Sequence, residues 1–102
     1  MQVVLHAGAA AEVSAAVSWY EEREPALGAA FLGELDRGLA VIAEAPYRWP
    51  VWPGARPELG ARRFLLARFP YGIAYRVRGQ RIIVLAVAHL HRRPGYWKVR
   101  QE

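Results

Sequence analysis

The sequence predicts an α+β fold, in which a hairpin of two helices packs on one face of a small and mostly antiparallel sheet. Two observations predict it. After a short strand-like start, the first half of the chain has a helical hydrophobic period, and three apolar stretches separated by turn signals fill the second half. The element order is therefore β-α-α-β-β-β. Because helices and strands are segregated along the chain, both helices are expected on the same side of the sheet.

The first half begins with a short apolar strand at residues 2–6 and continues as a helix over residues 9–23. One stripe of this helix, repeating at i, i+3, i+4 and i+7, consists of Val13, Ala16, Val17 and Tyr20. Glu12 and Trp19 lie off this stripe. Tyr20 is therefore expected in the core, and Trp19 is the better candidate for contact with a partner.

The second helix is expected to start at Pro25, because proline fits the first turn of a helix. It should end before Pro46, because the residue before a proline disfavours the helical conformation. Its apolar stripe consists of Leu27, Phe31, Leu35, Leu39 and Ile42. Glu34 falls on the polar side. Very few residues separate the two helices, so they are expected to form an antiparallel hairpin.

Residues 46–61 contain four prolines and two glycines and are expected to form a loop. We expect the two tryptophans of this loop, Trp49 and Trp52, to fold back onto the hydrophobic surface of the domain. The alternative is that they contribute to a functional surface.

Three strands are expected in the second half, at residues 62–68, 73–78 and 81–90. The first two are separated by the turn signal of residues 69–72, and the last two by the two-residue hairpin loop Gly79-Gln80. The last strand is apolar on both faces in its middle, as is typical of a central strand.

Length and composition indicate a single globular domain over residues 1–102, with 54% hydrophobic and 23% charged residues. The chain has no cysteine and three histidines, so disulfides are excluded and neither a metal centre nor a cofactor is expected. The N-terminus lacks the basic segment of a signal peptide, and no apolar run approaches the roughly 18 residues of a membrane span. A cytoplasmic location with no membrane partner is expected.

Charge is distributed unevenly along the chain. Residues 1–46 hold seven acids and two bases, a net charge of −5, whereas residues 47–102 hold twelve bases and two acids, a net charge of +10. All but one of the basic residues are arginine, which suits bidentate contacts with phosphate or carboxylate groups. The second half is therefore expected to present a positive surface to nucleic acid or to an acidic protein. The alternative is that this charge serves solubility alone.

Four stretches of the sequence are specific when taken together and in this order. They are WYEE at Trp19–Glu22, LGAAFLGELDRGLAVIAEAP at Leu27–Pro46, RRFLLARFPYGIAYRV at Arg62–Val77 and VLAVAHLHRRPGYW at Val84–Trp97. Over nearly its whole length the chain thereby resembles the RelE/ParE family of toxins from bacterial type II toxin–antitoxin systems. The last two stretches are most similar to the ParE branch and its plasmid-stabilisation relatives.

The resemblance implies a growth-inhibiting toxin with the fold predicted above. Such toxins bind a cognate antitoxin whose flexible, usually acidic C-terminal segment wraps around them, which implies a toxin–antitoxin hetero-oligomer. ParE-like members inhibit DNA gyrase and are not known as nucleases, whereas RelE-like members cut mRNA on the ribosome. A ParE-like toxin with gyrase as its target is the favoured interpretation. The alternatives are a ribosome-dependent mRNA endoribonuclease and a decayed member that has lost toxicity.

Arginines of the basic half are the candidates for binding the target, and Trp19 is the candidate for binding the antitoxin. The target-binding candidates are Arg62, Arg63, Arg68, Arg76, Arg92 and Arg93. Adjacent strand residues point to opposite faces of a sheet, so Arg62 and Arg63 are not expected to line the same site.

If the chain is a nuclease, the resemblance points to His89, Arg92 and Tyr96 as catalytic candidates. Metal-free RNA cleavage needs a base for the 2′-hydroxyl proton, cations for the phosphate and an acid for the leaving oxygen. An imidazole that titrates near neutrality suits either proton transfer. Two departures from the RelE pattern count against this role: the predicted strands carry no lysine, and Pro94-Gly95 changes the geometry before Tyr96.

The structural alternative for the same C-terminal segment is that it seals the core. In that case His89 packs against the helices, and Tyr96 and Trp97 cap the edge of the sheet. Arg92 and Arg93 would then pair with helix carboxylates such as Glu21 or Glu22.

Overall fold

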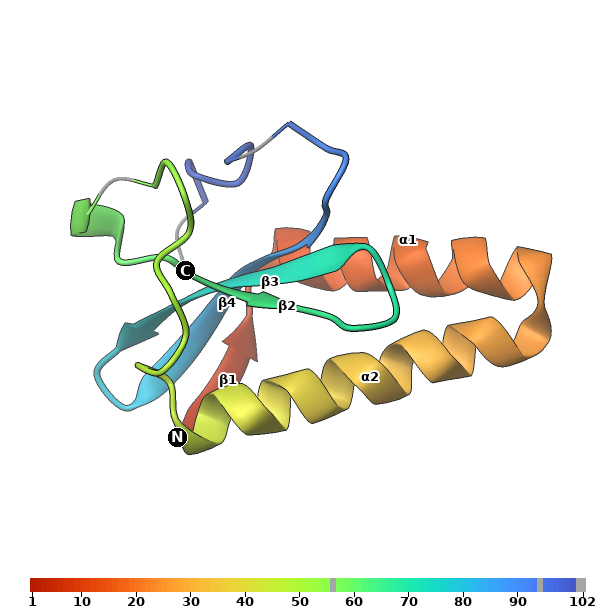
Figure 1. Ribbon diagram of the computed structural model, residues 1–102, viewed down its shortest axis with the longest axis horizontal. Coiled ribbons are helices and arrows are strands. Elements are labelled where there is room, and N and C mark those ends of the chain that lie inside the picture. The colour runs from red at the N-terminus through yellow and green to blue at the C-terminus, as the bar shows by residue number, and fades with distance from the viewer. Residues whose placement is uncertain (56, 94, 101–102) are drawn as a thin grey trace.

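The computed structural model describes residues 1–55, 57–93 and 95–100, so that Pro94 of the predicted chain break lies outside the described residues. The elements are β1 (Gln2–Leu5), α1 (Ala7–Arg23), α2 (Pro25–Glu44), a 3-10 helix η1 (Pro57–Leu59), β2 (Arg62–Leu65), β3 (Tyr71–Arg78) and β4 (Arg81–His89) (Figure 1). The predicted order and the α+β class are confirmed. Among the described residues, no helix combines the length and the apolar composition needed to cross a membrane.

The four strands form one mixed sheet in the order β1-β4-β3-β2. β2, β3 and β4 are an antiparallel meander, whereas β1 runs parallel to β4 with Leu5 opposite Val84. β4 is therefore an inner strand, which explains why its middle is apolar on both faces. β1 has four residues and β4 has nine, so β4 continues past the end of β1.

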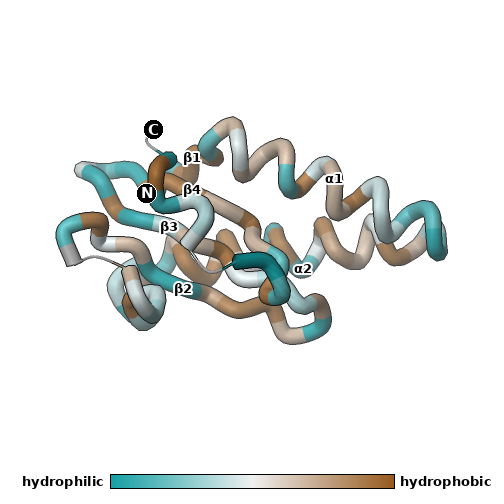
Figure 2. Tube along the Cα trace, turned by 90° about the horizontal axis from the view of Figure 1, so that it is seen from above, coloured by the Kyte–Doolittle hydropathy of each residue, from teal (hydrophilic) through white to brown (hydrophobic). Residues whose placement is uncertain are grey.

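The α1–α2 hairpin covers one face of the sheet with the predicted apolar stripes. In α2 the side chains of Phe31, Leu35 and Ile42 are buried against Ile73 and other sheet residues of the same cluster. The two helices run side by side past the end of the sheet, and the turn that joins them is hydrophilic (Figure 2).

The opposite face of the sheet is covered by the loop after α2 and by the C-terminal segment, which lie together on the side away from α2 (Figure 1). The buried rings of Trp52 and Trp97 meet edge-on with 5.2 Å between centroids and pack on Leu85 of β4. Trp49 packs instead on Phe64, on the helix side of the sheet. The prediction that Trp49 and Trp52 fold back onto the hydrophobic surface is confirmed.

The exit from α2 is fixed by a buried tyrosine of β3. The hydroxyl of Tyr75 donates a hydrogen bond to the carbonyl of Pro46 at 2.6 Å. Burial raises the pKa of Tyr75 to about 12, so this phenol keeps its proton at neutral pH. The contact attaches the start of the proline-rich loop to the core.

β2 is shorter than predicted, because it ends at Leu65 and not at residue 68. The chain turns where the carboxylate of Glu34 accepts the N–H of Arg68 at 2.8 Å and the N–H of Leu66 donates to the carbonyl of Tyr71 at 3.0 Å. Glu34 was expected on the polar side of α2 but is buried. Its carboxylate is needed there, because it satisfies a backbone donor of the turn.

We predict that Trp97→Ala lowers the free energy of unfolding by about 3–5 kcal/mol, because it removes a fully buried indole from the second core. Trp97→Phe should cost clearly less, since the indole N–H of Trp97 makes no hydrogen bond that phenylalanine would forfeit. Urea denaturation followed by circular dichroism measures both variants. Equal losses would mean that a polar contact of the indole, and not its packing, stabilises this face.

Candidate functional site

Just past the end of β1, the side chains of β4 stop alternating regularly between the two faces of the sheet. Leu85 and Ala86, although consecutive, both face the side covered by Trp52 and Trp97, and Val87 returns to the helix side. The register between β3 and β4 shifts at the same point. Two residues on one strand against one on its partner form a β-bulge, which bends the strand and increases its twist. The bulge brings the last residues of β4 over α1.

Beyond Leu5, no strand of the described residues lies along the outer edge of β4, so its backbone groups need other partners. The carbonyl of Leu85 accepts a hydrogen bond from the guanidinium of Arg100 at 2.9 Å. The N–H of Val87 donates to Oε1 of Glu12 at 3.0 Å. Side chains of α1 and of the C-terminal segment therefore take the place of a strand.

The carboxylate of Glu12 is the centre of this arrangement, although its side chain is only 12% exposed. Besides Val87, it accepts both terminal nitrogens of Arg100, at 3.1 Å on Oε1 and 3.0 Å on Oε2, and the hydroxyl of Tyr96. A carboxylate has about four lone-pair positions, so these donors fill it. Burial and the hydrogen bond to Glu12 raise the pKa of Tyr96, which therefore stays protonated.

Arg92 lies at the edge of this cluster. Its Nη1 is 3.6 Å from Oε2 of Glu12, its side chain is 55% exposed, and its guanidinium stands 3.9 Å from the ring centroid of Tyr96. A cation–π contact and a long ion pair hold it, and neither uses up its N–H donors. The helix carboxylate that Arg92 reaches is thus Glu12. The predicted partners Glu21 and Glu22 do not pair with it.

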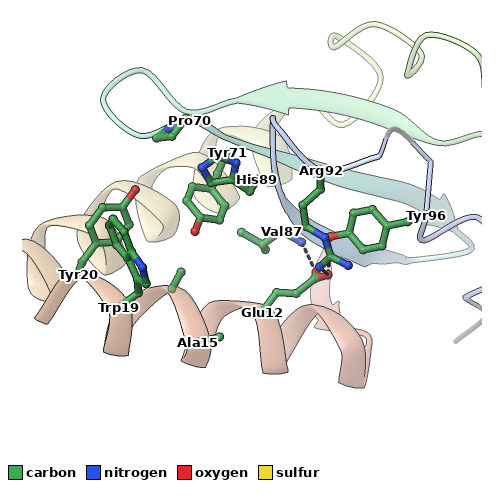
Figure 3. Close-up of a pocket in the computed structure, with 11 residues that line it drawn as sticks. Glu12, Ala15, Trp19, Tyr20, Pro70, Tyr71, Val87, His89, Arg92 and Tyr96 are labelled. Carbon is green, nitrogen blue, oxygen red and sulfur yellow. Dashed lines mark hydrogen bonds and ion pairs between the residues drawn. The ribbon is translucent and has the colours of Figure 1, made fainter. Parts of the chain in front are cut away.

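A pocket of about 540 Å³ lies between α1 and the end of β4 (Figure 3). Its walls are formed by Glu12, Ala15, Ala16, Trp19, Tyr20, Pro70, Tyr71, Val87, His89, Arg92 and Tyr96. The α1 residues follow the i, i+3, i+4, i+7, i+8 spacing of one helix face, over about 12 Å of helix. Figure 3 shows the two aromatic residues of α1 at one end and the Glu12 cluster at the other. The two alanines keep the middle open.

The two aromatic residues at one end of the pocket, Tyr20 and Trp19, differ in burial. Tyr20 stacks on Phe31 with 5.6 Å between ring centroids and meets Phe69 edge-on at 4.9 Å, so it belongs to the core. Trp19 is 50% exposed, and the guanidinium of Arg23 lies 3.4 Å from its ring centroid. Exposure thus distinguishes the two residues as the sequence predicted.

His89, the last residue of β4, contributes a wall of the pocket. Its ring meets those of Tyr71 and His91 edge-on, each with 5.0 Å between centroids. Its Nδ1 accepts the N–H of His91 at 3.1 Å, which places the proton of the neutral imidazole on Nε2. Burial, and then the neighbouring His91, lower the pKa of His89, so it is neutral at pH 7.

The predicted target-binding arginines do not form one patch. Arg62 alternates with Phe64 and faces the helix side, where its Nη1 donates to the carbonyls of Tyr47 at 3.2 Å and Trp49 at 2.6 Å. Arg68 lies in the turn after β2. The expectation that Arg62 and Arg63 face opposite sides is confirmed.

Three of these arginines do come together on the second side of the sheet. A cleft of about 200 Å³ is lined there by Trp52, Pro53, Arg63, Ala88, His89, Leu90, Arg92, Arg93, Gly95, Tyr96 and Trp97. Arg76 alternates with buried Ala74 and so shares this side without lining the cleft. Arg92 is the arginine that reaches both the cleft and the larger pocket.

Residues 3–94 match the model of a family described as ParE toxin of type II toxin-antitoxin system, parDE. The chain belongs to the ParE toxin family. Its fold is similar to that of a chain in a solved structure titled "Chromosomal ParDE TA system from P. aeruginosa", with a TM-score of 0.76 and 21% identity over 89% of this chain and 97% of that chain. Among curated proteins, none matches this chain.

The site candidates predicted from the sequence did not include Glu12, Tyr71 or Arg100. Glu12 and Trp19, both off the core stripe, are seven residues apart and so share a second helix face. That spacing is visible in the sequence and could have indicated a second functional stripe on α1. No local signal marks Arg100, whose role depends on the bulge in β4.

We predict that Glu12→Gln lowers the free energy of unfolding by about 2–4 kcal/mol, because it leaves Arg100 and the edge of β4 without their shared anionic partner. Glu22→Gln is the matched control. Glu22 is 75% exposed and pairs with Arg23 at 3.6 Å, so its loss should cost about 0.5 kcal/mol or less. Urea denaturation of both variants at neutral pH checks this prediction, and similar losses for the two would contradict it.

We predict that the free energy of unfolding depends on pH through the titration of His89. The pKa of His89 in the folded state lies below the usual 6.5. At pH values between the folded-state pKa and 6.5, the folded chain therefore binds fewer protons than the unfolded chain. The contribution of neutral His89 is therefore fully present above about pH 6.5 and is lost as the pH falls toward the folded-state pKa. The unfolding free energy of wild type should fall more between about pH 7.5 and about pH 5 than that of His89→Gln. Parallel pH profiles would show that His89 is not desolvated.

Proposed function

We propose that this ParE-family toxin inhibits DNA gyrase in the bacterial cytoplasm and is neutralised by a cognate antitoxin in a hetero-oligomer. Family membership supports both parts of the proposal. The observation that favours gyrase over RNA as the target is the hydrogen bond that Tyr96 makes. Its hydroxyl donates to Glu12, and its raised pKa keeps the proton in place, so it is poorly suited to act as a base.

The pocket around the nuclease candidates also supports a binding role. His89 and Tyr96 line walls that include Ala15, Ala16 and Val87, which offer no donors to a phosphate. Arg92 is the cation nearest to Tyr96, at 3.9 Å from its ring centroid, and it has a carboxylate beside it.

For target contact, the cleft on the second side of the sheet is the proposed centre. Arg63, Arg92 and Arg93 line it together with Trp52, a combination suited to acidic or planar groups of a protein target. Arg76 adds positive charge on the same side, whereas Arg68 lies in the turn after β2, beside Glu34 of α2 and outside the cleft. Arg62 is proposed to act indirectly, because its donors hold the loop that carries the tryptophans.

A ribosome-dependent endoribonuclease is the second candidate function. One observation favours it: the imidazole of His89, the guanidinium of Arg92 and the phenol of Tyr96 line one pocket. If substrate displaced Arg92 and Tyr96 from Glu12, the three would provide an imidazole, a cation and a phenol. A decayed toxin that retains only antitoxin binding is the third possibility.

We predict that the purified chain inhibits DNA supercoiling by gyrase and leaves mRNA intact in a translation reaction analysed by primer extension. Arg63→Gln combined with Arg93→Gln should raise the concentration for half-inhibition about ten-fold or more. Arg48→Gln, an exposed arginine outside both the pocket and the cleft, is the control and should inhibit as wild type does. Ribosome-dependent cuts inside codons would instead establish the nuclease, and neither activity would indicate a decayed toxin.

A further inference from the structure

We propose that the target protein adds an extended segment to the outer edge of β2. In this proposal the backbone of the segment pairs with that of Leu65, and one of its apolar side chains enters a pocket between α2 and β2. Acidic side chains beside it bind Arg37 and Arg68. The inference rests on the proposed inhibition of DNA gyrase. It adds the mode of contact with the target and the chemistry of the segment that is bound.

β2 is the last strand of the sheet, and the proline-rich loop covers only the start of its outer edge. There the N–H of Trp52 donates to the carbonyl of Ala61 at 2.9 Å, and the N–H of Arg63 donates to the carbonyl of Pro50 at 2.8 Å. Every second residue of a strand directs its backbone groups to the same edge, so those of Leu65 also point outward. They have no backbone partner among the described residues, and the side chain of Leu65 is 46% exposed. A further strand can therefore pair here.

A pocket of about 290 Å³ lies on the helix side of this edge, between α2 and β2. Its apolar walls include Val41 of α2 and Phe64 and Leu66 at β2, and Gly38 adds no side chain to it. In a strand added to β2, every second side chain would point toward this side of the sheet. An apolar side chain of the segment would thus be buried in the pocket while the backbone pairs with the edge.

The alternate side chains of the added strand would point to the second side of the sheet. Leu65 and Trp52 meet there over Gly72, where a Cβ would be 3.2 Å from Leu65 and 3.1 Å from Trp52. Arg63, two residues before Leu65 on the same strand, lines the cleft proposed as the centre of target contact. The free edge of β2 therefore continues this cleft, and one partner can occupy both.

Two arginines beside the pocket favour acidic residues in the bound segment. Arg37 of α2 and Arg68 of the turn after β2 both line the pocket and are exposed. None of the described residues forms an ion pair with either of them. The carboxylate of Glu34 also belongs to the lining, but it is buried and accepts the backbone N–H of Arg68. Both guanidinium groups are thus available for carboxylates of the target.

The first test removes the outward N–H of Leu65. An edge strand tolerates proline where the N–H faces solvent, so Leu65→Pro removes a donor for the partner and no hydrogen bond to β3. Leu65→Ala keeps this N–H and is the matched control. The inhibition of DNA supercoiling by gyrase is measured for both purified variants, and thermal unfolding shows whether they fold. Leu65→Pro should raise the concentration for half-inhibition about ten-fold, and Leu65→Ala should raise it less than about three-fold.

The second test removes a cation. Arg37→Gln should raise the concentration for half-inhibition about five-fold and make it less dependent on salt, because a charge-assisted contact is lost. Arg23→Gln is the control, since Arg23 is an exposed helix arginine outside the pocket and the cleft, and it should leave both quantities unchanged. Arg37 lies on the surface, so this variant tests the proposal even if Leu65→Pro fails to fold.

The outcomes separate this inference from the proposed function. Inhibition that changes with neither Leu65→Pro nor Arg37→Gln would overturn strand addition and leave gyrase as the target. A wild-type chain that does not inhibit gyrase would overturn both. If Leu65→Pro inhibits normally but converts a dimer of the chain to a monomer, the edge belongs to a second copy. If it inhibits normally but no longer binds the antitoxin in calorimetry, the edge belongs to the antitoxin, and either result overturns the inference.

Discussion

Where β1 ends at Leu5, the inner strand β4 continues with one edge uncovered, and an uncovered edge is costly unless its backbone groups find partners. Glu12 of α1 and Arg100 of the C-terminal segment supply them. A carboxylate with so little exposure would itself destabilise the fold if it were unpaired. It is tolerated because four donors converge on it, and each donor is fixed in place in return.

The rest of the C-terminal half follows from that constraint. Arg100 and Tyr96 are held at the edge of β4, so the turn between them places Trp97 on the second face of the sheet, against Trp52. The core on that face thus depends on a contact made on the other side of β4. Glu34 plays a parallel role at the turn after β2, where it accepts the N–H of Arg68. In both cases a helix carboxylate completes the sheet where strand pairing stops.

Hydrophobic periodicity was sufficient to predict the element order, the helix hairpin and the different environments of Tyr20 and Trp19, because all three depend on local spacing. It was not sufficient to predict that the carboxylates of Glu12 and Glu34 are largely buried. A periodic pattern treats a carboxylate as polar wherever it lies, whereas burial of these two depends on a backbone donor that exists only after the sheet has formed. The donor at Val87 depends in turn on the bulge in β4 and on the shortness of β1, which are properties of the tertiary structure.

Arg92 connects the two surfaces of the molecule. It lines the pocket over α1 and also the cleft on the second side, where Arg63 and Arg93 gather. A partner that draws its guanidinium into the pocket removes one of the three arginines from the cleft.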